Sequence, residues 1–91
     1  MAVIAVFLNI DQHRVAPALQ EAAEKLNGAE GEVILDFSSV ARVDSSALQA
    51  MEELARKAEG TAVRVVLRGV NVDVYKVLKL VKLTRRFSFL N

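Results

Sequence analysis

The sequence predicts a small α/β domain of about four mostly parallel strands and three or four helices. Its 91 residues are 53% hydrophobic and 25% charged, which suits a domain with a real core and argues against disorder. Short apolar runs alternate with segments of helical periodicity, and the resulting β-α-β-α-β-α-(β) order predicts parallel strands joined by right-handed crossovers. No repeat, low-complexity segment or linker interrupts residues 1–91, so a single domain is expected.

The first strand is expected over residues 3–9, which are almost entirely apolar. A polar connection leads to a helix predicted over residues 16–26, with Pro17 in the first turn, where a missing N–H costs nothing. Asn27 and Gly28 are expected to end this helix with a left-handed cap. The apolar N-terminal stretch is too short for a membrane span or an ordinary signal peptide, so a core strand without membrane insertion is expected.

The central segment, residues 33–59, holds the second strand and the second helix. It begins with an apolar, β-branched run that is typical of a buried strand. After a polar break, Asp44, Ser45 and Ser46 precede a helical pattern, and their side-chain oxygens suit the unpaired N–H groups of a helix N-terminus. The apolar face of that helix is formed by Leu48, Met51, Leu54 and Ala58.

A third strand is predicted over residues 62–67, and its nearly continuous apolar run suggests cover on both faces. Gly69 ends it, and Asn71 is read as the N-cap of a third helix that runs to about Leu83. The residues of this helix expected to pack inward are Val74, Val77, Leu78 and Val81. A last short strand or an apolar tail is expected at Phe87, Phe89 and Leu90.

The composition argues against several kinds of chemical site. Without cysteine there is no disulfide, thiolate metal site or cysteine nucleophile, which suits a reducing cytoplasm. The single histidine, His13, is read as a solvated loop residue, and no Gly-x-Ser-x-Gly elbow surrounds Ser45, so no catalytic residue is expected. The acidic residues are scattered and the four glycines form no phosphate loop, so neither a metal nor a cofactor is expected.

Charge is unevenly distributed along the chain, although the formal net charge is +1. Residues 1–60 carry five basic and ten acidic groups, and residues 61–91 carry seven basic and one acidic. This polarity suits steering toward a polarised partner, whereas nucleic-acid binding is not expected because aromatic residues are few and not interleaved with basic ones. A basic group near the C-terminus is read either as a solvated helix face or as a docking site for an acidic protein surface or phospholipid headgroups. It comprises Lys76, Lys79, Lys82, Arg85 and Arg86.

Residues 34–48, Ile-Leu-Asp-Phe-Ser-Ser-Val-Ala-Arg-Val-Asp-Ser-Ser-Ala-Leu, resemble the signature of STAS domains, the family of bacterial anti-sigma-factor antagonists. Residues 10–19, Ile-Asp-Gln-His-Arg-Val-Ala-Pro-Ala-Leu, are similar to a second pattern of that family. The resemblance implies a cytoplasmic, non-enzymatic regulator that binds an anti-sigma-factor kinase. It also implies that this kinase, which binds any ATP involved, phosphorylates Ser45 and thereby releases the regulator.

The resemblance also implies roles for individual residues, each beside a purely structural alternative. Ser45 is either a plain helix cap or the phosphoacceptor, and Ser46 is a first-turn residue or a second acceptor. Asp44 both caps the helix and orients the hydroxyl, and Asp11 either forms a turn or contacts the partner. The partner-binding surface implied by the family consists of Asp11, Asp44, Ser45, Ser46, Ala47 and Gln49.

Three features depart from the family pattern. The usual extra N-terminal strand is missing, which leaves the first strand with an unpaired edge and leaves pairing into a homodimer open. Ala47 replaces a glycine, so a partner's backbone approaching there is expected to meet a methyl group. Lys82 replaces a glycine that follows the last main helix, and because a left-handed lysine is strained, the helix is expected to end differently.

Residues 67–80 resemble especially the STAS subunit of bacterial phospholipid-transport ABC systems, which docks on an ATPase subunit. This likeness implies an alternative function, in which the domain stabilises the ATPase of a lipid transporter. A further alternative, from a different class, is an anionic-ligand-binding module that uses the basic C-terminal helix for phosphate or lipid headgroups.

Overall fold

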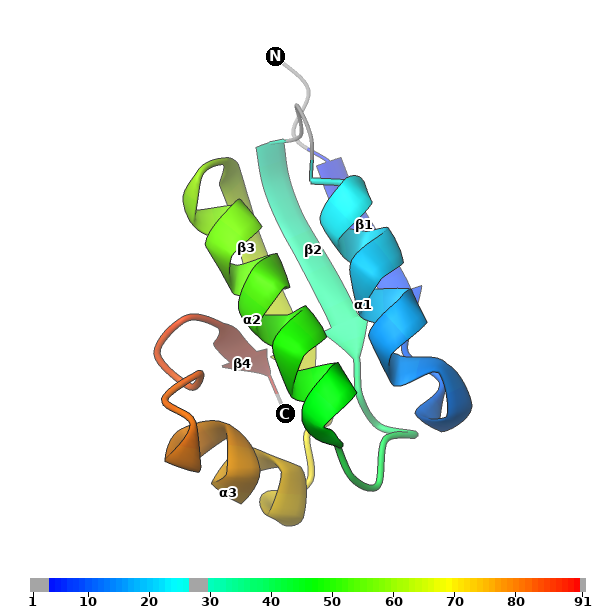
Figure 1. Cartoon of the computed structure of the whole chain (residues 1–91). Coiled ribbons are helices and arrows are strands. Elements are labelled where there is room, and N and C mark those ends of the chain that lie inside the picture. Colours follow the sequence, from blue (N-terminus) through cyan, green and yellow to red (C-terminus); the bar gives the residue numbers. More distant parts are fainter. Residues whose placement is uncertain (1–3, 27–29, 91) are drawn as a thin grey trace.

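The computed structural model describes residues 4–26 and 30–90, in which a layer of helices covers one face of a four-stranded sheet (Figure 1). The strands are β1 (Ile4–Asn9), β2 (Glu30–Asp36), β3 (Ala62–Arg68) and β4 (Ser88–Leu90). A short 3₁₀ turn at Gln12–Arg14 precedes α1 (Val15–Glu24), and the later helices are α2 (Ser45–Glu59) and α3 (Val72–Leu80). The predicted α/β class is confirmed.

The strand order follows the chain, β1-β2-β3-β4, and every neighbouring pair is parallel. A right-handed crossover that always steps in the same direction along the sheet places every connecting helix on the same face. Figure 1 shows α1 and α2 side by side in front of the strands, with α3 near the carboxyl ends of β3 and β4. Within the part of the chain that the structure describes, the opposite face of the sheet therefore carries no helix.

The core lies between the helices and the face of the sheet that they cover. Val33 and Leu35 of β2 pack there with alternate residues of β3 and with the apolar faces of α1 and α2. Leu19, Met51 and Leu54, from these helices, have no exposed surface. The expectation that the third strand is covered on both faces is wrong. Its alternate residues Ala62, Arg64 and Arg68 are exposed, because the sheet is wound in one direction only.

The end of α1 and the start of β2 differ from the sequence-based expectation. α1 ends at Glu24, because Lys25 and Leu26 form a turn in which the Leu26 N–H donates to the Ala23 carbonyl (3.2 Å). β2 begins at Glu30, ahead of its apolar run, because pairing with β3 extends the strand beyond the pattern visible in the sequence. The expected cap at residues 27–28 and the expected strand residue 3 lie outside the described residues.

The last helix ends with the left-handed lysine that the sequence argued against. α3 stops at Leu80, and Lys82 has φ 62°. The Lys82 N–H donates to the Lys79 carbonyl (3.1 Å) and the Leu83 N–H to the Leu78 carbonyl (2.9 Å), the two hydrogen bonds of a Schellman motif. Leu78 and Leu83 are both buried, so the burial of these side chains outweighs the strain at Lys82.

Val81 was expected to face inward and is exposed instead. It is the C-cap of α3, so the chain has already left the helical path that would have turned its side chain toward the core. The expected last strand is present as β4, which pairs with β3 from Val66 to Arg68.

Replacing Lys82 with glycine is expected to raise the free energy of unfolding by about 0.5–1 kcal/mol, because glycine adopts a positive φ without steric cost. Urea denaturation measures the change. The matched control is Lys79→Gly inside α3, which is expected to lower stability by about 1 kcal/mol. A Lys82→Gly protein no more stable than the wild type would contradict the strain assigned to this cap.

Candidate functional site

The candidate site lies where the loops that follow β1, β2 and β3 meet. In a parallel sheet the carboxyl ends of neighbouring strands share one edge, which gathers these loops and the N-termini of the helices. The Ile10 N–H donates to the Asp36 carbonyl (3.0 Å), and the Phe37 N–H donates to the Arg68 carbonyl (2.7 Å). The three loops therefore leave the sheet in contact with one another.

Asp36 is the last residue of β2, and its side chain forms hydrogen bonds with the loop that follows the strand. Its Oδ1 accepts hydrogen bonds from the hydroxyl (2.6 Å) and the N–H (3.0 Å) of Ser38. These two bonds, with a smaller contribution from the charge of Arg68, hold the pKa of Asp36 below its ordinary value. Gly69 has φ +71°, and a Cβ on it would lie 3.0 Å from the Ser38 Cβ, so the turn after β3 requires glycine.

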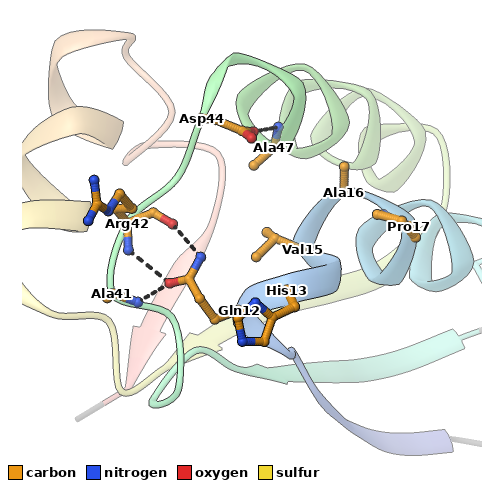
Figure 2. A pocket seen from close by; sticks show the side chains of 9 residues that line it. All are labelled: Gln12, His13, Val15, Ala16, Pro17, Ala41, Arg42, Asp44 and Ala47. Atoms are coloured by element: carbon orange, nitrogen blue, oxygen red, sulfur yellow. Dashed lines mark hydrogen bonds between the residues drawn. The ribbon is translucent and has the colours of Figure 1, made fainter.

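Two amide side chains hold the presenting loop, which we define as residues 37–44. The Oε1 of Gln12 accepts from the N–H groups of Ala41 and Arg42, and its Nε2 donates to the Arg42 carbonyl (3.2 Å) (Figure 2). From the other side, the Nδ2 of Asn71 donates to the carbonyls of Val40 and Ala41, both at 3.1 Å. A loop that has no strand or helix to pair with is thus anchored by two side chains.

Asn71 also confirms its predicted role as a helix cap. Its Oδ1 accepts from the Val74 N–H (2.7 Å) and so begins α3. One asparagine therefore joins the start of α3 to the presenting loop.

Ser45 is the first residue of α2, directly after this loop. Asp44 is the N-cap, as predicted, and its Oδ1 accepts from the Ala47 N–H (2.8 Å). Ser45 is exposed to solvent. Its hydroxyl is therefore presented at the positive end of a fifteen-residue helix, on a backbone that the anchored loop holds in place.

The other expected contact residues lie in different environments. Ser46 and Gln49 are exposed on the first turns of α2. Asp11 is exposed too, and its Oδ1 accepts from the His13 N–H (2.8 Å), which gives it the local turn-forming role. Ala47 is only 1% exposed, so the methyl group expected to meet a partner's backbone is buried in the protein instead.

A hollow of about 460 Å³ lies among the presenting loop and the starts of α1 and α2 (Figure 2). The Gln12 side chain lines it and points toward Ala41 and Arg42. The residues that line the hollow are Gln12, His13, Val15, Ala16, Pro17, Ala41, Arg42, Asp44 and Ala47. Sequence reasoning missed Gln12 because a single glutamine in a polar connection forms no pattern, and its partners lie about thirty residues away.

Neither metal-binding nor membrane-spanning features emerge from the described ranges. Among residues 4–26 and 30–90, no three His, Cys, Asp or Glu side chains gather as a metal-ligand group. Within the same ranges, no helix combines the length and the apolarity needed to cross a bilayer.

Fold and site together define a small α/β domain, wound in one direction, with a serine presented at a helix N-terminus. A family model described as "Mlab, STAS domain" matches residues 3–90, and the chain belongs to this STAS family. The fold is similar to a crystal structure from Thermotoga maritima described as a "putative anti-sigma factor antagonist". That match has a TM-score of 0.71 at 16% identity and covers 99% of this chain and 83% of that one. A search of curated protein sequences found no match.

Replacing Gln12 with alanine is expected to speed amide hydrogen exchange at Ala41 and Arg42 about fivefold, because one hydrogen bond protects each amide by about 1 kcal/mol. Exchange followed by NMR measures the effect residue by residue. Gln20→Ala, an exposed change on α1, is the matched control and should leave both amides unaffected. Unaltered exchange in the Gln12 variant would show that the loop does not depend on this anchor.

Replacing Ser38 with alanine is expected to raise the pKa of Asp36 toward the ordinary value for an aspartate, because the hydroxyl donor is lost. The pKa of Asp36 is lowered in the folded protein. The ionised Asp36 carboxylate therefore contributes its full stabilisation at pH values above the pKa that Asp36 has in the unfolded chain. This contribution is lost as pH falls through the lower pKa of Asp36 in the folded protein. Carbon-13 NMR titration of the carboxyl group gives the pKa, with Ser39→Ala as the neighbouring control. An unshifted titration in the Ser38 variant would contradict the assignment.

Proposed function

We propose that this protein is a regulator of the anti-sigma-factor-antagonist kind, which binds a partner kinase and is switched by phosphorylation of Ser45. The observation that carries the proposal is the presentation of Ser45, an exposed first-turn residue of α2 that follows a loop anchored on both sides. Membership of the STAS family supports a protein partner in general. The partner identity and the modification are our inference.

In the proposed reaction, the Ser45 Oγ attacks the γ-phosphorus of an ATP that the partner kinase binds. The bond between that phosphorus and the bridging oxygen breaks, ADP leaves, and the hydroxyl proton passes to a base of the kinase. Asp44 caps α2 through its Oδ1 and so fixes the backbone that carries the adjacent Ser45. The domain itself supplies the acceptor hydroxyl on a fixed backbone.

The consequences of phosphorylation differ between the fold and the complex. The modification adds about −1.5 to −2 charge at the mouth of α2. The helix N-terminus favours a negative charge by about 0.3–1 kcal/mol, and Asp44 opposes it, so the fold is expected to persist. A partner docked over Ser46 and Gln49 would have to bury or displace a hydrated dianion, so the complex is expected to separate.

A second candidate is a subunit that stabilises the ATPase of a lipid-transport ABC system. The observation that favours it is the family model, whose description names Mlab, together with the likeness of residues 67–80 to such subunits. In this case the same exposed surface around Ser45 would bind the ATPase without being modified. Stable copurification of such an ATPase with a Ser45 that carries no phosphate would favour this candidate.

Anionic-ligand binding through α3 remains a third proposal. Lys76, Lys79 and Lys82 are all exposed, as are the apolar residues Leu80 and Val81 beside them. Binding to anionic vesicles that disappears when the three lysines are changed to glutamate would support it.

Incubation with ATP and the cognate anti-sigma-factor kinase is expected to place one phosphate on Ser45, as mapped by mass spectrometry. Ser45→Asp is expected to weaken kinase binding at least tenfold in calorimetry, while Ser45→Ala binds and stays bound in the presence of ATP. Ser46→Ala is the matched control and should be phosphorylated normally. A phosphate on another residue, or a Ser45→Asp protein that binds as tightly as the wild type, would refute the switch.

A further inference from the structure

The outer face of the sheet, which we define by the residues that alternate with those of the core, is the largest unassigned feature of the molecule. Ile34 lies between Val33 and Leu35 of the core, and Val66 lies between Val65 and Leu67. Val66 is 5% exposed and is not part of the core cluster. The described residues that form this face are Phe7, Asn9, Glu32, Ile34, Asp36, Ala62, Arg64, Val66, Arg68, Ser88 and Leu90.

Apolar side chains remain accessible on this face. Phe7 is 52% exposed on β1 and Leu90 is 49% exposed on β4, one near each side of the sheet. The register places Phe7 beside Ile34, and Ile34 beside Val66. An apolar row thus runs across the middle of the three longer strands.

Pairs of oppositely charged residues lie before and after this row along β2 and β3. The acidic residues Glu32 and Asp36 lie on β2, and the basic residues Arg64 and Arg68 lie on β3. Glu32 is in register with Arg64, and Asp36 is in register with Arg68. The face therefore has an acidic column next to a basic column, with the apolar row between the two charged levels.

The arginines lie along the face and do not extend straight into solvent. The Cζ of Arg68 is 6.0 Å from the ring centroid of Phe7, two strands away. The Nε of Arg64 donates to the Ser88 Oγ on the neighbouring strand (3.0 Å). Both guanidinium groups are thus held at the level of the sheet surface, where a second flat surface could reach them.

We propose that a second copy of this chain covers the outer face, with the two sheets stacked face to face. The fit follows from symmetry. A two-fold axis parallel to the strands and midway between β2 and β3 lays β2 of each copy over β3 of the other without changing the register. In backbone register, position 32 of one copy then lies over position 64 of the other, position 36 over position 68, and position 34 over position 66.

A second copy fits this surface better than a partner with a single sign of charge. A uniformly acidic or basic partner would be repelled by one of the two columns, whereas a rotated copy meets the opposite charge at each. The arrangement also has the usual anatomy of an interface, with an apolar centre between polar margins, and stacked sheets pack about 10 Å apart. The dimer leaves Ser45 outside the interface, because α2 lies on the helix-covered face of the sheet, so the proposal does not depend on the proposed function.

Two charge reversals test the pairing directly, using the whole chain and sedimentation equilibrium over a concentration series. The wild type is expected to form dimers that weaken as salt rises, because the facing charges are screened. Glu32→Arg alone and Arg64→Glu alone are each expected to weaken dimerisation at least tenfold, since like charges then face each other. An equimolar mixture of the two variants is expected to restore the dimer, because position 32 of one copy again meets an opposite charge at position 64 of the other.

The matched controls reverse exposed charges on the helix layer. Glu24→Arg on α1 and Arg56→Glu on α2 should dimerise like the wild type. Thermal melting by circular dichroism checks that each variant is folded. If a reversal lowers the melting temperature, Phe7→Asp is the replacement, because it places a charge on the exposed part of the apolar row and is also expected to weaken dimerisation at least tenfold.

Three results would overturn the proposal. The first is a wild type that stays monomeric throughout the concentration series. The second is a dimer that tolerates both reversals, which would place the contact elsewhere, such as the edge of β1. The third is loss of dimerisation in each variant without recovery in the mixture, which would show that positions 32 and 64 do not face each other.

Discussion

The winding of the sheet constrains every other feature of this molecule. The four strands lie in chain order and are parallel, so each connection steps in the same direction. Because such connections share one hand, the helices gather on one face, and the core forms between that face and the helix layer. The same winding leaves the other face of the sheet without a helix among residues 4–26 and 30–90, and it brings the loops after β1, β2 and β3 together at one edge.

At that edge, hydrogen bonds from side chains hold the backbone of the presenting loop, which has no strand or helix partner. The presenting loop belongs to neither strand nor helix, so its polar groups need other partners. Gln12 and Asn71 provide them from opposite sides, and Asp44 then begins α2. The result is an exposed serine on a fixed backbone, an arrangement that an enzyme can recognise without a deep pocket.

The two surfaces of interest have different physical characters. The edge that presents Ser45 is polar and depends on a loop, whereas the outer face combines a row of apolar residues with paired columns of charge. They meet only at the carboxyl ends of β2 and β3, and Ser45 itself lies on the helix-covered side of the sheet, away from the outer face. This arrangement is compatible with both of the contacts that we propose.

The sequence by itself determined the order of strands and helices, and it located the caps Asp44 and Asn71, because a cap is a hydrogen bond between residues three apart. For the same reason it located Ser45 at the start of a helix. Only the tertiary structure decided that Gln12 anchors the presenting loop, since those residues are about thirty positions apart.

The left-handed Lys82 was likewise decided by packing, because burial of Leu83 against the core sets the path of the chain there. The open face of the sheet was decided by the strand order. A run of apolar residues indicates that a strand is buried. It does not indicate on which side of that strand the next strand of the sheet pairs.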